Sequence, residues 1–227
     1  MQDSPASLPQ SLSAADLVSR AADFAIEAQQ PLRTLCSDRP RDYFLKVESI
    51  QVIDCEDEAL ISWAKKHKRF LAATEVSSYL ATPGLEDVGN KEHNVWKVET
   101  SSGAFMIRRT KGGIYGLPER SPFQYLQRMA DVSVQIPDAE INFLCVSQSP
   151  LGAGAIWTIQ PYIEGGHPSD DELAEWLSNQ GWVQKDDRRH RYYQRGSVKI
   201  HDLHIGNCIK TPNGHIIPVD VFFEGLE

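Results

Sequence analysis

The spacing of apolar residues along the chain predicts several helices. Over Ser11–Gln29 the apolar positions recur at steps of three and four residues, which is the period of one helix face. A second helix is expected to begin near Glu56, because acidic residues come first and basic residues follow, as the helix dipole favours. A third is expected to begin at Pro122. A fourth is expected to begin at Ser169 and to stop at Gly181, because glycine suits the end of a helix.

Short apolar or alternating runs lie between these helices and predict strands. The runs are Asn94–Glu99, Ala104–Thr110, Ile141–Val146, Ile156–Ile163, Tyr192–Tyr193, Val198–Ile200, Cys208–Lys210 and His215–Val221. Thr-Ser-Ser-Gly joins the first two and Thr-Pro-Asn-Gly joins the last two, so both pairs are expected to be hairpins. Short alternating apolar runs within Asp42–Asp54 predict a further strand. This order of elements predicts an α+β fold with an antiparallel sheet, and it differs from a βαβ repeat.

Composition narrows the class of protein. The chain has 227 residues, of which 41% are hydrophobic, as expected for a globular protein with one good core. The net charge of -8 argues against nucleic acid as a partner, because nucleic-acid binders carry basic patches. No apolar run is long enough to span a membrane and the start resembles no secretory leader, so we expect a cytoplasmic protein without a membrane partner. The four cysteines are far apart in sequence, as expected for reduced thiols.

Two aspartates near the end of the sequence lie in apolar, strand-like surroundings. In KIHDLHIGNCIKTPNGHIIPVDVFF, Asp202 is followed after five residues by Asn207 and after 18 residues by Asp220. Phosphate transfer from ATP needs a carboxylate at the acceptor hydroxyl, a second that holds Mg²⁺, and a carboxamide that can hold another Mg²⁺. The protein-kinase catalytic loop also has an asparagine five residues after its aspartate. The spacing therefore favours a kinase-type site. A metal-dependent hydrolase that uses His201, His204 and both aspartates, or a purely structural motif, remains an alternative.

The same stretch resembles the end of the kinase domain found in polyvalent proteins of phages and mobile elements. More distantly it is similar to aminoglycoside and choline kinases, whose loop has the pattern H-G-D-L-H-x-x-N. Further upstream, ALISWAKKHKRFL resembles the leading helix of that family, and GNKEHNVWKV resembles its G-x-E-H-x-V turn with one extra residue. SPFQYLQRM resembles its P-x-E-Y-L-x-R-L helix, and IQPYIEGGHPSDDELAEWL resembles its strand, hinge and following helix. The resemblance covers roughly Glu56 to Phe223.

This resemblance implies a protein-kinase-like fold with two lobes, of which the C-terminal lobe is reduced. It divides the chain into an N-terminal helical extension (residues 1–55), an N-lobe-like region (56–163) and a short C-lobe with the catalytic loop (164–227). The implied cofactors are ATP and Mg²⁺. The acceptor is a hydroxyl group of a protein or a small molecule that the sequence does not identify. Only a short segment follows Asp220, so we expect the acceptor platform to come from elsewhere or to be absent.

The resemblance also implies roles for particular residues. Asp202 would be the catalytic base, Asn207 and Asp220 the Mg²⁺ ligands, and His204 a brace for the loop. Gln160, Tyr162 and Ile163 would flank the adenine, with hinge contacts mainly through the backbone. The remaining nucleotide contacts are expected from Arg108 and from a turn over the phosphates that holds Gly89, Glu92 and His93.

Two positions depart from the family pattern. Arg108 stands where the family has a lysine, and its planar fork differs in size and geometry from an ammonium group. The helix that should carry the glutamate partner of this lysine has Gln124 and Gln127 instead, while Glu119 lies just upstream. These substitutions favour a second interpretation, a pseudokinase that acts as a binding or regulatory module. The intact set of Asp202, Asn207 and Asp220 favours a weakly active kinase.

Overall fold

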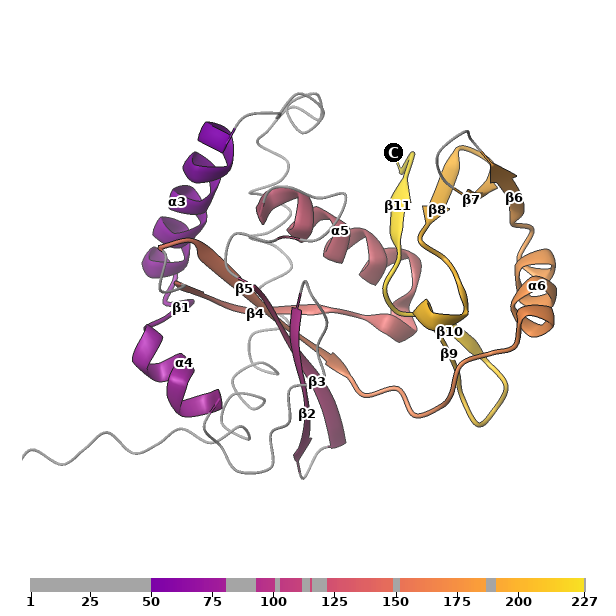
Figure 1. The fold of residues 1–227 in the computed structure, drawn as a ribbon, viewed down its shortest axis with the longest axis horizontal. Coiled ribbons are helices and arrows are strands. Elements are labelled where there is room, and N and C mark those ends of the chain that lie inside the picture. Colours follow the sequence, from indigo (N-terminus) through magenta and orange to yellow (C-terminus); the bar gives the residue numbers. More distant parts are fainter. Residues whose placement is uncertain are drawn as a thin grey trace, which may run out of the picture.

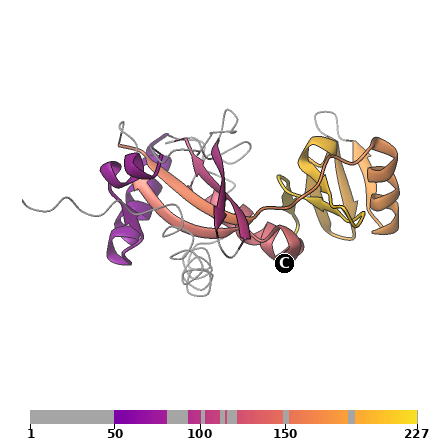
Figure 2. The same cartoon turned by 90° about the horizontal axis from the view of Figure 1, so that it is seen from below.

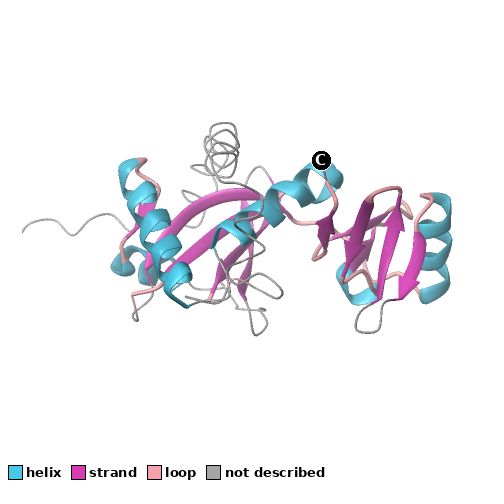
Figure 3. Ribbon diagram, turned by 90° about the horizontal axis from the view of Figure 1, so that it is seen from above, coloured by secondary structure: helices cyan, strands magenta, loops and turns pink. Residues whose placement is uncertain are grey.

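The computed structural model of the protein describes residues 50–80, 93–100, 103–111, 115, 122–148, 152–186 and 191–226. Within these residues the fold is a mixture of helices and mainly antiparallel sheets, as the predicted α+β class requires (Figure 1). The chain forms two parts that stand side by side in all three views of the ribbon (Figures 2 and 3). The first part is built on a five-stranded sheet and the second on a four-stranded sheet. No described helix has the length and apolar character needed to cross a membrane.

The five-stranded sheet has the strand order β1-β4-β5-β3-β2. Its strands are β1 (Phe70–Leu71), β2 (His93–Thr100), β3 (Gly103–Thr110), β4 (Asn142–Gln148) and β5 (Gly154–Pro161). All neighbours are antiparallel except β1 and β4, which run parallel. Seven consecutive residues of β5 are buried, so both faces of this central strand are covered. In β2, buried Trp96 and Val98 alternate with exposed Lys97 and Glu99, as a half-covered strand requires.

Three helices cover this sheet: α3 (Ile50–Lys66), α4 (Ala73–Leu80) and α5 (Pro122–Gln135). On one face, Leu60 of α3 and Leu126 of α5 join a large buried cluster with Ile156 of β5. A second, smaller cluster contains Val76 of α4 and the stacked rings of Trp96 and Trp157, whose centroids are 5.6 Å apart. The helix α5 therefore lies on the face opposite to this second cluster, and it also borders the second part of the molecule.

The second part contains α6 (Asp170–Asn179) and two groups of short strands. The four-stranded sheet has the order β11-β8-β7-β6, and a separate hairpin pairs β9 with β10. Its strands are β6 (Val183–Asp186), β7 (Arg191–Arg195), β8 (Val198–His201), β9 (Cys208–Lys210), β10 (Ile216–Pro218) and β11 (Phe222–Glu224). The large buried cluster continues from α5 into this part through Leu173, Ile200 and Val221, so one core joins both parts.

Several predicted elements agree with the structure, and others do not. The helix that we expected to begin near Glu56 begins at Ile50. It therefore crosses the expected boundary between the N-terminal extension and the N-lobe-like region at residue 56. It also occupies the last residues of the strand expected within Asp42–Asp54. The expected last hairpin is present as β9 and β10, but the separate strand β11 was not predicted. The strands β1 and β6 and the helix α4 were likewise not predicted from the sequence. The expected helix over Ser11–Gln29 lies outside the described residues.

The segment after β5 is tied to the second part at Gly165 and Gly166. Gly166 and Lys210 exchange two backbone hydrogen bonds, of 3.1 and 2.6 Å. A Cβ atom added at Gly165 would lie 2.2 Å from the carbonyl oxygen of Lys210. The helix α6 follows at once, and Ser169 and Glu172 form a complete capping box at its start. The connection between the two parts is therefore short and fixed at both ends.

We expect Gly165→Ala to destabilise the protein by about 1–3 kcal/mol, because the added methyl group must push the Lys210 backbone away. Gly166→Ala is the matched control, since a Cβ atom there meets no atom within 4 Å. Urea denaturation of both variants would measure the difference. Equal stability of the two variants would contradict the close approach of Gly165 to Lys210.

Candidate functional site

The pairing of β8 with β11 brings the two aspartates of the sequence motif to one end of a sheet. These strands are antiparallel, with His201 opposite Phe222. Asp202 follows the last residue of β8, and Asp220 lies two residues before β11. In an antiparallel pair, the end of one strand lies beside the start of the other. The β9–β10 hairpin, which connects the two aspartates in sequence, returns the chain to the same place.

Asn207 joins the two aspartates directly. Its Nδ2 donates to the backbone oxygen of Asp202 at 2.8 Å, to Oδ2 of Asp202 at 3.2 Å and to the backbone oxygen of Asp220 at 2.8 Å. Its backbone oxygen accepts a hydrogen bond from Val219. The structure thus brings together Asp202, Asn207 and Asp220. The link between them is the side chain of Asn207, whose position five residues after Asp202 indicated the site.

Asp202 has a backbone conformation that few residues adopt. Its φ angle is 57°, and Lys68 is the only other non-glycine residue with a positive φ in the described ranges. Such conformations gather at functional sites, where the surrounding structure has to hold them in place. His204 supports this loop. Its Nδ1 accepts a hydrogen bond from the backbone N–H of Gly206, and its Nε2 lies 3.7 Å from Oδ1 of Asp202. The Asp202 side chain is 57% exposed, so it is open to solvent.

Two arginines converge on the carboxylate of Asp220. Arg128 of α5 donates from Nη2 to Oδ1 of Asp220 at 3.0 Å, and from Nε to the backbone oxygen of Val221 at 3.2 Å. Arg108 of β3 places Nη1 3.9 Å from the same Oδ1. Arg128 was not among the residues predicted for the site. It lies four residues after Gln124 on the predicted helix, so the helical period could have indicated it as a second residue on that face.

The arginine at the expected lysine position lies on the sheet face that looks towards α5 and Asp220. Arg108 is opposite Thr158 of β5, and Met106 is opposite Gln160. Residues that face each other across a strand pair lie on the same side of the sheet, so Arg108 and Gln160 share this face. Both are largely buried, and neither Nε of Arg108 nor Oε1 of Gln160 has a hydrogen-bond partner among the described residues.

The other residues expected at the nucleotide are placed differently. Tyr162 follows β5 and is 39% exposed, with Nζ of Lys97 4.1 Å from its ring centroid. Its backbone N–H donates to Ala104, so this N–H is already used within the sheet. Ile163 lies next to it and is half-buried. Gln127 bonds to Asp131 on its own helix. Gly89, Glu92 and Glu119 lie outside the described residues.

His93 does not lie in a turn, as we expected, but is the first residue of β2, opposite Thr110. It is buried, and its Nε2 shares a hydrogen bond of 3.2 Å with the hydroxyl of Tyr125 on α5. Burial lowers the pKa of His93 to about 4, and the nearby charges of Arg108, Arg128 and Lys111 act in the same direction, while Asp220 opposes them. Burial also raises the pKa of Tyr125 to about 12. Both side chains are therefore neutral near pH 7, and the positive charge beside Asp220 comes from the arginines.

The depressed pKa of His93 gives the protein a defined pH dependence. Below pH 6.5 the unfolded chain binds a proton on this histidine, whereas the folded chain does not until about pH 4. Stability is therefore lost as the pH falls through this window, by up to about 3 kcal/mol. In the variant His93→Gln, the loss of stability that is due to protonation of His93 in the unfolded chain should be absent. Urea denaturation at several pH values between 7 and 4 would show it, and identical pH profiles of the variant and the parent would contradict a buried neutral histidine.

Oxygen atoms that suit a divalent cation remain at the site. The Nδ2 atom of Asn207 donates to three acceptors, so the Oδ1 atom of the same side chain faces a different direction. Neither this Oδ1 nor Oδ2 of Asp220 has a hydrogen-bond partner among the described residues. Mg²⁺ is usually held by one or two side chains together with phosphate oxygens. Within the described ranges, no cluster of three or more His, Cys, Asp or Glu side chains could hold a metal alone. Asp220 and Asn207 thus fit a cation that arrives together with a phosphate group.

The residues needed for the alternative metal-dependent hydrolase do not form one cluster. The ring of His201 stacks on Phe222 at 4.6 Å and on Tyr192 at 5.5 Å. Its Nε2 lies 3.4 Å from Oε2 of Glu224, on the face of the four-stranded sheet. His204 is engaged with the loop backbone. These positions give the hydrolase interpretation no support.

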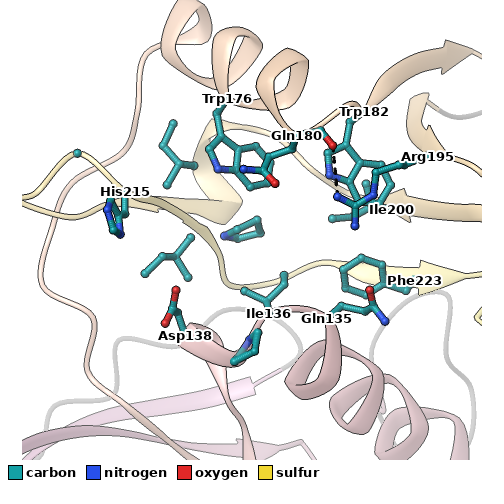
Figure 4. Close-up of a pocket in the computed structure, with 15 residues that line it drawn as sticks. Gln135, Ile136, Asp138, Trp176, Gln180, Trp182, Arg195, Ile200, His215 and Phe223 are labelled. Carbon is teal, nitrogen blue, oxygen red and sulfur yellow. Dashed lines mark hydrogen bonds between the residues drawn. The ribbon is translucent and has the colours of Figure 1, made fainter.

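A pocket of about 440 Å³ lies between the end of α5 and the second part (Figure 4). Trp176, Trp182 and Ile136 contribute to its wall, and Arg195 covers the Trp182 ring at 4.6 Å. Neither the two aspartates nor Asn207 line it. It is therefore distinct from the site around Asp202.

No protein-family model matches the chain, and no curated protein matches it.

Proposed function

We propose that the protein is a kinase-like phosphotransferase that uses ATP and Mg²⁺ to phosphorylate a hydroxyl acceptor. In this proposal the five-stranded sheet with α5 is the N-lobe, and the part with α6 and the four-stranded sheet is a reduced C-terminal lobe. The chain would be a diverged relative of the kinase domains of polyvalent proteins. The acceptor, a protein or a small molecule, is left open.

One observation carries this proposal: a single side chain, Asn207, holds the loop of Asp202 against the backbone of Asp220. In a kinase-type site, the corresponding three groups are the base, a metal-binding carboxamide and the metal-binding carboxylate. The unusual backbone conformation and the exposure of Asp202 support the role of an acid–base group at a site that a substrate can enter.

The proposed reaction assigns one task to each group. The hydroxyl oxygen of the acceptor forms a bond to the γ-phosphorus of ATP, and the bond from that phosphorus to the bridging oxygen breaks, so that ADP leaves. The carboxylate of Asp202 takes the hydroxyl proton. Asp220 and Asn207 would hold Mg²⁺, which neutralises charge that develops on the phosphate oxygens. Gln160 and the segment after β5 would border the adenine.

A pseudokinase is the second candidate, and the contact between Arg128 and Asp220 favours it. A guanidinium group hydrogen-bonded to Oδ1 already neutralises much of the charge that a metal ion would need. A site of this kind can bind nucleotide and act through a partner without transferring phosphate. Transfer is therefore the property that separates the two candidates.

The direct test is transfer of label from γ-³²P-ATP by the full-length protein. Suitable acceptors are the protein itself, Ser/Thr/Tyr peptides, and small molecules with several hydroxyl groups. We expect slow, Mg²⁺-dependent labelling of at least one acceptor. The variant Arg108→Lys with Gln124→Glu should label faster, because it restores the family's lysine and glutamate. Absence of transfer in both proteins would leave the pseudokinase as the better interpretation.

A further inference from the structure

We propose that the pocket beside the end of α5 binds a small aromatic monocarboxylate. This pocket is the one drawn in Figure 4, and its volume of about 440 Å³ lies in the range of small-molecule sites. Asp202, Asn207 and Asp220 are not among the residues that line it. The proposal therefore goes beyond the proposed function and does not depend on phosphate transfer.

Segments that are far apart in the sequence meet around this pocket. One wall is the end of α5 together with the short 3₁₀ helix η1 (Pro137–Ala139), and the facing wall is α6 with the residues that follow it. Residues of β7, β8, β10 and β11 complete the lining. In Figure 4, Trp176 extends from α6 on one side of the pocket and Ile136 lies on the other side. A ligand between them would contact both parts of the protein.

The way in which α6 ends explains why two tryptophans line one pocket. Gly181 has a φ angle of 73°, and the backbone N–H of Trp182 donates to the carbonyl oxygen of Leu177 at 2.9 Å. This is the usual glycine-ended cap, in which the residue after the glycine folds back beside the last turn of the helix. Trp182 is thereby brought to the pocket that Trp176 also lines. Two indole rings with the aliphatic Ile136 on the other side favour a flat apolar ligand body.

Arg195 of β7 supplies a positive charge at one end of the pocket. Its Cζ lies 4.6 Å from the centroid of the Trp182 ring, and its Nη1 donates to the carbonyl oxygen of Gln180 at 3.3 Å. None of the carboxylates that the structure describes forms an ion pair with it. A guanidinium group has five N–H donors in its plane, so most of them are left for a ligand. A carboxylate fits them because it can accept two parallel hydrogen bonds.

The charges around the pocket favour a ligand with one negative group over a ligand with several. Among the described residues of the lining, Arg195 is the one arginine or lysine. The one carboxylate of the lining, Asp138, lies at the end opposite to Arg195 (Figure 4). A polyphosphate would leave most of its charge against apolar side chains, which is costly. A monocarboxylate can place its charge at Arg195 and its ring between Trp176 and Ile136.

Isothermal titration of the full-length protein with cinnamate and with cinnamamide tests the proposal, because the two probes share their ring and differ in charge. Wild type should bind cinnamate about tenfold more tightly than cinnamamide. Arg195→Gln should weaken cinnamate binding about tenfold and change cinnamamide binding by no more than about twofold. The matched control is Arg109→Gln, which removes another arginine that lies over a tryptophan, 5.5 Å from the Trp157 ring in the first part. This variant should bind both probes as wild type does.

A further variant, Trp176→Ala, should weaken both probes about tenfold, because both use the apolar wall. Arg195 is exposed, so its replacement should leave the protein folded, and melting temperatures of all variants would verify this. The proposal is overturned if wild type binds no cinnamate at millimolar concentrations, or binds cinnamamide or the cation cinnamylamine equally well. It is also overturned if Arg195→Gln and Arg109→Gln bind cinnamate with the same affinity, since the charge of Arg195 would then play no part.

Discussion

Replacing Asp202 by asparagine is expected to lower the rate of phosphate transfer by a factor on the order of 10² to 10⁴, while ATP binding changes little. A carboxamide cannot take the proton of the acceptor hydroxyl, but its oxygen can still accept the hydrogen bond from Asn207. Asp202 is exposed, so the fold should tolerate the change. Initial rates of label transfer and calorimetric titration with ATP would measure the two effects separately.

The control for this prediction is Asp138→Asn, which removes an exposed carboxylate from the short 3₁₀ helix after α5, away from the site. Its transfer rate should equal that of the wild type. Two results would contradict the role of Asp202: an unchanged rate in Asp202→Asn, or a parallel loss of transfer and ATP binding. The second result would mean that Asp202 holds the nucleotide instead of accepting a proton.

Asn207→Ala should reduce both stability and transfer, which distinguishes it from the Asp202 variant. The change removes the donor that bonds to Asp202 and Asp220, and the loop is then free to leave its strained conformation. We expect a loss of about 2 kcal/mol in the free energy of unfolding. We also expect a loss of transfer of about a hundredfold, because misplacement of a catalytic group by about 1 Å can cost that much. Urea denaturation and label transfer would measure the two losses.

Asn179→Ala is a suitable comparison, since Asn179 is exposed at the end of α6. It should change stability by no more than about 0.5 kcal/mol and leave transfer unaffected. If Asn207→Ala proves as stable and as active as Asn179→Ala, the three hydrogen bonds of Asn207 do not hold the site together.

Elements with a strong local signal could be predicted from the sequence. The start of α6 follows from Ser169 and Glu172, which form the capping box. The hairpin of β2 and β3 follows from two alternating runs around a short turn. In contrast, β11 depends on pairing with β8, and a three-residue strand next to Val221 carries no pattern of its own. The short helix α4 and the two-residue strand β1 are equally weak as local signals.

The same distinction between local and distant signals applies to the site. The spacing from Asp202 to Asn207 lies within one loop, so the sequence could indicate that these residues act together. The contact of Arg128 with Asp220 joins residues 92 positions apart, and it depends on which face of α5 meets the second part. The family pattern of this helix matches Arg128 as well as the glutamate position taken by Gln124, but we predicted a role only for the glutamate position. The contact of Arg128 with Asp220 was therefore not predicted.

Hydrogen exchange of the full-length protein, measured by mass spectrometry with and without Mg²⁺ and ATP, tests most directly whether these residues form one nucleotide site. It requires no knowledge of the acceptor and no mutation. We predict that ATP slows amide exchange together in three segments: the loop after β8 (residues 201–208), the turn at Asp220 (residues 219–222) and strand β3. Exchange in α6 should not change and serves as the internal reference. Unchanged exchange in the loop and the turn at saturating ATP, or slowing confined to other segments, would contradict the account.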